Sequence, residues 1–208
     1  WADITAEDES YGVSILNDCK VGWDKPADNI LRLTLLHTPA SSSQGFQDNT
    51  SNDLGRHEFT YAITGHKGSW KDITPCQAAS FNQPLYTFQT VAHQGPLGKS
   101  FSFVKPESKQ VMIKALKLAE EGDNIIMRVQ EMHGQNAEKI KITFTPALRQ
   151  VKKVNGIEEE IPEKDEGKEV RQKVQKDSIL ACSLTPYQPA AYALQINRRI
   201  LPAEKIKR

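Results

Sequence analysis

Three segments near the N-terminus decide the fold: Asn17-Asp18-Cys19-Lys20-Val21-Gly22-Trp23-Asp24, then Leu31-Arg32-Leu33-Thr34-Leu35-Leu36, then Gly55-Arg56-His57-Glu58-Phe59-Thr60-Tyr61. They predict a strand, a polar turn, a second strand, a long loop and a third strand. A plain hairpin connection needs only Gly, Asn or Asp at its turn. The first segment instead gathers acid, base and amide groups between two apolar runs. Such a turn is suited to recognising a polar ligand.

Strand patterns continue along the rest of the chain. Apolar residues fall on every second position of 29–36 and of 58–64, which is the period of a half-buried strand. One helix is expected at 74–81, with Thr74 as its cap and Pro75 in its first turn. Short strands at this spacing are typical of a sandwich or a barrel. Further strands are expected at 11–16, 85–91, 101–104, 111–117, 125–131, 139–145, 148–154, 179–184 and 190–196.

The domain organisation follows from length and composition. A chain of 208 residues without a repeat or a shift in composition predicts one β domain over 1–208. Two long polar loops interrupt it, at 39–53 and at 158–177. The chain begins at Trp1 without a Met, so we expect it to be a piece of a longer protein.

The charge balance argues against two classes of partner. There are 27 basic and 26 acidic residues and no basic stripe, so a nucleic-acid surface is not expected. No apolar run reaches the length that crosses a membrane. Cys19, Cys76 and Cys182 show no metal-ligand spacing and predict reduced, mostly buried thiols.

Catalytic chemistry has weak candidates. A glycosidase needs two carboxylates flanking one bond, and the two polar loops hold several acids, which loops also favour for turn geometry. His37, His57 and an Asp of 39–53 could converge on a metal, or the two histidines could simply hydrogen-bond their neighbours at strand ends. No nucleophile elbow or phosphate loop is present. We therefore single out no catalytic residue and no metal ligand.

A ligand-facing edge is the better-supported site. If strands 29–36 and 58–64 pair antiparallel, the end of the first meets the start of the second, which places His37 near His57. The turn before 29 would then lie at the opposite end of that strand, unless the preceding strand is long or bent. The same edge could instead dock on another domain. The candidate substrate-binding residues are His37, Asp48, Arg56, His57, Asp18 and Lys20.

The order of these pieces resembles the C-terminal β domain of glycoside hydrolase family 38, the α-mannosidases. The resemblance is carried by Trp1-Ala2-Asp3-Ile4-Thr5, by Tyr11 through Lys20, by Leu31 through Leu36, and by Gly55 through Tyr61. Looser matches follow at 115–120, at Arg128 and Glu131, and at Leu184-Thr185-Pro186-Tyr187. The family often has Arg where this chain has His37, and Pro-Tyr-Glu where it has Pro186-Tyr187-Gln188.

This resemblance implies a large antiparallel β-sandwich of the galactose mutarotase-like supersandwich type, here an incomplete part of it. Family members are retaining enzymes whose zinc ion and Asp nucleophile lie in an N-terminal catalytic domain that this chain does not contain. The implied partners are that catalytic domain and a mannose-containing glycan, with no cofactor in this chain. We expect the isolated chain to be inactive.

Three functions remain open on the sequence. The first is an accessory module that shapes the cleft of an α-mannosidase. The second is an independent carbohydrate-binding module. The third is a small mutarotase-like enzyme using a His and a carboxylate.

Overall fold

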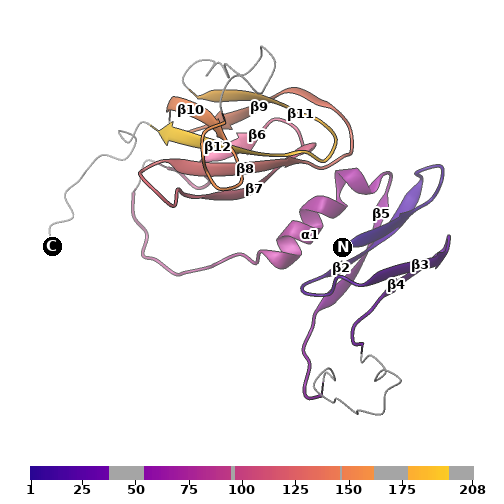
Figure 1. The fold of residues 1–208 in the computed structure, drawn as a ribbon. Coiled ribbons are helices and arrows are strands. Elements are labelled where there is room, and N and C mark those ends of the chain that lie inside the picture. The colour runs from indigo at the N-terminus through magenta and orange to yellow at the C-terminus, as the bar shows by residue number, and fades with distance from the viewer. Residues whose placement is uncertain (38–53, 95–96, 146, 162–177, 197–208) are drawn as a thin grey trace, which may run out of the picture. The chain divides into compact units, whose positions relative to one another are not determined.

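Two compact units make up the computed structural model of this chain, Trp1–Thr90 and Val91–Arg208, named here the N-terminal unit and the C-terminal unit. The structure describes residues 1–37, 54–94, 97–145, 147–161 and 178–196. Strands dominate both units (Figure 1), so the expected all-β fold class is confirmed. A single domain over 1–208 stays a prediction.

The N-terminal unit is built on a three-stranded antiparallel sheet with the order β1-β2-β5. Its strands are β1 (Ala2–Thr5), β2 (Tyr11–Asn17) and β5 (Tyr61–Lys67). A separate hairpin is formed by β3 (Trp23–Ala27) and β4 (Ile30–Leu33). The sequence pattern predicts a turn where β3 begins and no strand where β1 lies, so both strands are additional to those expected.

The expected pairing of 29–36 with 58–64 is wrong. Strand β4 pairs with β3, while β5 pairs with β2 in a register that sets Asn17 against Tyr61. The local cause is a two-residue connection, because Ala27 pairs with Ile30 and leaves only Asp28 and Asn29 between them. Asp and Asn favour such tight turns, and a short loop closes at a smaller entropic cost than a long one.

Helix α1 (Thr74–Asn82) follows a single 3-10 turn, η2 (Trp70–Asp72), and contacts β2. Figure 1 shows it beside β2 and β5. Pro75 occupies the first turn as expected, but the expected capping role of Thr74 is wrong, because Ile73 is the N-cap residue. The Thr74 hydroxyl instead lies 2.6 Å from Ser14 Oγ, because this end of the helix is buried against the sheet.

A buried polar cluster, named here the Asp3 cluster, lies between the sheet and α1. Asp3 accepts hydrogen bonds from Thr5 Oγ1 and Ser14 Oγ, each at 2.5 Å, and its Oδ2 lies 2.7 Å from His66 Nε2. The other ring nitrogen of His66 lies 2.9 Å from the carbonyl oxygen of Gly68. The side chains of His66 and Asp3 are 0% and 5% exposed. Since buried polar groups must find partners, this cluster fixes α1 to β2.

The C-terminal unit is an antiparallel sandwich of a four-stranded sheet, β10-β12-β8-β7, and a three-stranded sheet, β11-β9-β6. Figure 1 shows the two sheets stacked. Apolar residues from the facing sides form one core, which includes Met127, Ile142, Leu180 and Tyr192. The strands are β6 (Val104–Pro106), β7 (Val111–Leu118), β8 (Ile125–Glu131), β9 (Ala137–Phe144), β10 (Leu148–Val154), β11 (Ile179–Leu184) and β12 (Pro189–Ile196).

A fully buried carboxylate, Glu131, ends β8 on the core side of this sandwich. Its Oε1 accepts from the backbone N–H of His133 at 2.8 Å and from Gln110 Nε2 at 3.2 Å. Its Oε2 accepts from the backbone N–H groups of Gly134 at 2.9 Å and Tyr187 at 2.8 Å. One side chain thus joins the start of β7, the loop after β8 and the turn between β11 and β12.

Acid should weaken the C-terminal unit through Glu131. Burial acts to raise the pKa of this carboxyl, but its hydrogen bonds to Tyr187, His133, Gln110 and Gly134 outweigh burial and hold the pKa below its ordinary value of 4.5. A group with a depressed folded pKa stabilises the fold above its unfolded pKa and loses that contribution as the pH falls through the folded pKa. We expect the urea concentration at the unfolding midpoint to decrease as the pH is lowered below about 4.5. This dependence of the midpoint on pH should be weaker in Glu131→Gln. An unchanged dependence in that variant would contradict the assignment.

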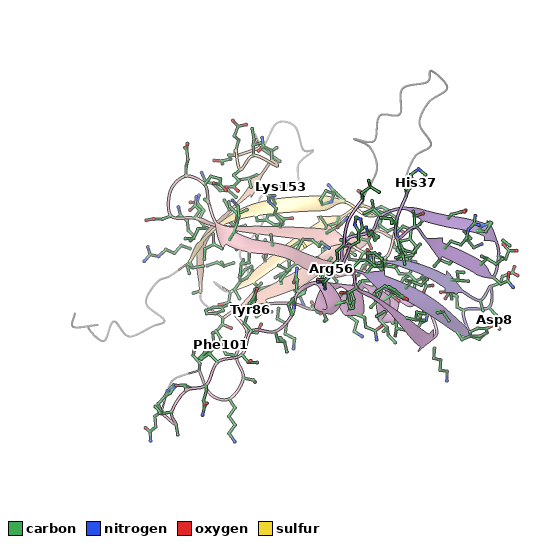
Figure 2. The ribbon with its side chains drawn as sticks, turned by 90° about the horizontal axis from the view of Figure 1, so that it is seen from below. Asp8, His37, Arg56, Tyr86, Phe101 and Lys153 are labelled. Atoms are coloured by element: carbon green, nitrogen blue, oxygen red, sulfur yellow. The ribbon has the colours of Figure 1, made fainter. Side chains whose placement is uncertain are left out.

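Two further expectations are wrong. Residues 85–91 form no strand, and Leu85, Tyr86, Phe88 and Val91 are exposed. The alternation there reflects strand propensity, but a strand also needs pairing and burial. Of the strand expected at 101–104, only Val104 lies in a strand, β6. Tyr86 and Phe101, which both lie outside the strands, are labelled in Figure 2.

The cysteines also differ from the expectation of mostly buried thiols. Cys19 and Cys76 are exposed, because one lies in a turn and the other on the outer side of α1, whereas Cys182 is buried. Burial raises the pKa of Cys182 to about 11, so that thiol is unreactive in the folded chain. No helix in the described part of the chain is long and apolar enough to cross a membrane.

Candidate functional site

The polar turn after β2 lies against the residues that lead into β5. Because Asn17 is paired with Tyr61, the next residue on each side, Asp18 and Thr60, also meet. The backbone N–H of Asp18 donates to the Thr60 carbonyl at 3.2 Å, and the Thr60 N–H donates to Asp18 Oδ2 at 2.9 Å. The turn is therefore held in place by the sheet and not by its own residues alone.

Lys20 is positioned from both of its ends. Its backbone N–H donates to Asn17 Oδ1 at 2.9 Å, which closes the turn. Its ammonium group lies 5.1 Å from the centre of the Phe59 ring. A cation over an aromatic face is attracted by the ring quadrupole, so Lys20 and Phe59 form a preorganised pair beside Asp18.

The electrostatics of the turn favour a charged carboxylate. A hydrogen bond with the Cys19 side chain, together with that from Thr60, holds the pKa of Asp18 below its ordinary value. The same hydrogen bond and the charge of Asp18 raise the pKa of the Cys19 thiol. Asp18 is therefore an acceptor at neutral pH, and Cys19 is a neutral thiol.

Arg56 and His57 precede Phe59 in the same connection. Arg56 forms an ion pair with Glu58, and the side chains of both residues remain 85% and 74% exposed. His57 is exposed too. Because these side chains are exposed, their charges are accessible to a partner or ligand. An exposed ion pair of this kind adds little to stability.

The structure brings only part of the candidate set together. Asp18 and Lys20 lie beside Phe59 and Thr60, a few residues along the chain from Arg56. Strand pairing does not bring His37 next to His57, because β4 pairs with β3 and β5 pairs with β2. Figure 2 shows the exposed side chain of His37 apart from Arg56. Asp48 and the whole loop at 39–53 lie outside the described residues.

We name the grouping of Asp18, Lys20, Arg56, Phe59 and Thr60 the charged edge. It presents a carboxylate beside an ammonium that lies over an aromatic ring, and a guanidinium three residues before that ring in the chain, the kinds of group that recognise hydroxyl-rich ligands. The sequence pattern places Phe59 and Thr60 inside the third strand, but β5 begins only at Tyr61, so their roles at this edge were not expected. Thr60 and Phe59 are the two residues before Tyr61, and the pairing of Tyr61 with Asn17 brings them to the turn. This can be seen only when the strand register is known.

Within the described part of the chain, no three His, Cys, Asp or Glu side chains gather as a metal site would require. The charged edge supplies a single carboxylate from this set, whereas a catalytic zinc needs three protein ligands. The residues of the edge thus do not fit a zinc ion.

The C-terminal unit matches a known family. Residues 110–188 match the glycosyl hydrolases family 38 C-terminal beta sandwich domain. This range runs from Gln110, just before β7, to the turn that precedes β12, so it includes Glu131 and all four of its hydrogen-bond donors.

Curated relatives extend the match beyond this range. The chain is 35% identical over 142 residues to "Alpha-mannosidase 2C1" of Homo sapiens, covering 66% of this chain and 13% of that protein. It is 30% identical over 168 residues to "Alpha-mannosidase G" of Dictyostelium discoideum, covering 76% of this chain and 14% of that protein. The chain thus spans a small part of the length of these relatives.

A solved structure of a protein in glycosyl hydrolase family 38 from Enterococcus faecalis has the same fold. The match has a TM-score of 0.65 at 18% identity and covers 91% of this chain and 21% of that one. The family match, the two α-mannosidase relatives and this fold agree with the resemblance drawn from the sequence. The chain belongs to glycosyl hydrolase family 38, as a C-terminal β-sandwich domain of the α-mannosidases.

Proposed function

We propose that this chain is an accessory module of a zinc-dependent retaining α-mannosidase, which shapes the sugar-binding cleft and packs on a catalytic domain outside these 208 residues. The zinc ion and the nucleophile belong to that domain. The partners in this proposal are the catalytic domain of the same protein and a mannose-containing glycan.

The charged edge is the observation that carries the proposal. Asp18 and Lys20 are held by contacts to Asn17, Phe59 and Thr60. Groups that are already ordered lose little further freedom when they bind. Two oppositely charged groups on one ordered turn therefore suit a cleft wall better than a plain surface loop.

The substrate-binding residues in this proposal fall into three groups. Asp18, Lys20 and Arg56 belong to the charged edge, with His57 next to Arg56 in the chain. His37 is retained as an exposed donor that another segment would have to approach. Asp48 is retained from the sequence alone.

The test uses the full-length parent enzyme. Lys20→Ala and Arg56→Ala should each lower kcat/KM for a mannoside, because each removes a charged hydrogen-bond donor. Such a loss corresponds to about 1.5–3 kcal/mol of transition-state binding, or roughly a 10- to 100-fold fall in kcat/KM. The measurement is steady-state kinetics with an aryl α-mannoside.

Arg32→Ala is the matched control. Arg32 also forms an exposed ion pair, with Asp24, but it lies on the β3–β4 hairpin and not on the charged edge. It should keep the parental kcat/KM. If Lys20→Ala and Arg56→Ala behave like Arg32→Ala while remaining folded, the charged edge does not face the substrate.

A further inference from the structure

Helix α1 is attached to β2 at both of its ends. At the start of the helix the Thr74 hydroxyl lies 2.6 Å from Ser14 Oγ. At its end the side-chain amide of Asn82 donates to the carbonyl oxygen of Asn17 at 3.1 Å. The nine residues of α1 make a helix about 13 Å long, and the stretch from Ser14 to Asn17 is about 10 Å of strand. The two stretches are comparable in length, so the helix can contact β2 at both ends.

The amide nitrogen of Asn82 serves two carbonyl groups at once. It donates to the Asn17 carbonyl at 3.1 Å and to the Ala78 carbonyl at 3.0 Å. An amide nitrogen carries two N–H donors, so neither bond excludes the other. One side chain thus joins the last turn of α1 to the last residue of β2.

Asn17 lies where the pairing of the sheet becomes one-sided. It is paired with Tyr61 of β5, whereas β1 pairs with β2 only from Gly12 to Ile15. The hydrogen bond from Asn82 is therefore a second support for the backbone of Asn17, in addition to its pairing with β5.

The side chain of Asn17 connects this support to the polar turn. Asn17 is 8% exposed, and its Oδ1 accepts from the backbone N–H of Lys20 at 2.9 Å. The Lys20 ammonium in turn lies 5.1 Å from the centre of the Phe59 ring. Asn82, Asn17 and Lys20 thus form a continuous series of contacts from α1 to the charged edge.

We propose that Asn82 is a positioning residue of the charged edge, which holds Lys20 over Phe59 by acting through Asn17. Without it, the turn would sample arrangements in which Lys20 is away from the ring, and binding would then include the cost of ordering it. The effect on catalysis rests on the proposed function, because the position of Lys20 matters for the rate only if Lys20 faces the substrate.

Hydrogen exchange in the full-length parent tests the first step. In Asn82→Ala, we expect the backbone amides of Asp18 and Lys20 to exchange about 3- to 10-fold faster, the range for the loss of one ordinary hydrogen bond. These amides report on the turn, because they donate to Thr60 O and to Asn17 Oδ1. Ala favours the helix more than Asn does, so lower helix propensity cannot be the cause.

A double-mutant cycle tests whether Asn82 acts through Lys20. Asn82→Ala should lower kcat/KM for an aryl α-mannoside about 3- to 10-fold in the parent, but less than about 2-fold in the Lys20→Ala background. Residues that act on one interaction are not additive, whereas independent residues are. A residue that only stabilised the unit would lower kcat/KM by the same factor in both backgrounds.

Gln83→Ala is the matched control. Gln83 follows Asn82 directly and is exposed at the C-terminal end of α1. Its substitution should change neither the exchange of the Asp18 and Lys20 amides nor kcat/KM by more than about 2-fold, as is usual for a surface position.

Two results would overturn the positioning role. The first is unchanged exchange at Asp18 and Lys20 in Asn82→Ala, whatever the kinetics show. The second is an equal fall in kcat/KM in both backgrounds, because Asn82 would then act independently of Lys20. If exchange is faster while Lys20→Ala keeps the parental kcat/KM, the positioning role stands and the proposed function fails alone.

Discussion

Asp3→Ala should lower the free energy of unfolding of the N-terminal unit by about 3–5 kcal/mol, the usual cost of removing one partner from a buried pair. Asp3 is the common acceptor of Thr5, Ser14 and His66. Its removal leaves a fully buried histidine ring nitrogen and the buried Ser14 hydroxyl without this acceptor.

Tryptophan fluorescence during urea unfolding is the measurement, because all three tryptophans, Trp1, Trp23 and Trp70, lie in the N-terminal unit. Asp24→Ala is the control, since Asp24 forms an exposed ion pair with Arg32 in the same unit. Its loss should cost no more than about 1 kcal/mol. Equal losses in the two variants would show that the Asp3 cluster does not hold the unit together.

Glu131→Gln should destabilise the C-terminal unit by about 2–4 kcal/mol, since hydrogen bonds to a charged group are among the strongest and a buried unsatisfied group is costly. The substitution preserves shape but exchanges one acceptor oxygen for an NH₂ group. That NH₂ must face donors, because each carboxylate oxygen is approached by two: His133 N–H and Gln110 Nε2 on one side, Gly134 and Tyr187 N–H on the other.

The region around Glu131 cannot relax easily. Gly134 has a φ of 69°, and a Cβ atom there would lie 2.5 Å from Tyr187 Oη. The backbone that supplies the donors is thus held by a residue in the left-handed region and by an overlying ring.

Labelling of Cys182 measures this effect, because its thiol is buried in the sandwich core and reacts only when the unit opens. Cys19 and Cys76 are exposed and give a separate, fast phase. Glu131→Gln should speed the slow phase by roughly 30-fold or more, the change in opening equilibrium for about 2 kcal/mol. Glu138→Gln, on an exposed position of β9, should leave it unchanged.

Local patterns were sufficient where a strand alternates and ends at a clear turn. The expected strands at 125–131, 148–154 and 179–184 coincide with β8, β10 and β11. The helix formers at 115–118 lie in β7, as expected, because pairing with β8 outweighs helix propensity. Alternation failed at 85–91, where propensity is present but no neighbouring strand pairs with it.

The candidate site was less predictable because it depends on a pairing between distant segments. Asp18 and Lys20 were expected at the far end of the second strand, and the β2–β5 register instead places them beside Thr60 and Phe59. Which strands pair is set by the sum of many side-chain contacts across the sheet. No single turn or motif in the sequence reports that sum.

The sequence by itself determined the all-β class, most strand positions in the C-terminal unit and the family, because strand alternation and motif order are local properties of the chain. Only the tertiary structure decided the β2–β5 pairing and the roles of the buried charges. Asp3 and Glu131 are ordinary acids in the sequence, and Glu131 merely continues the inward phase of Met127 and Val129. Their partners are backbone, hydroxyl, amide and imidazole groups as many as 63 residues away, and such partners leave no periodic trace in the sequence.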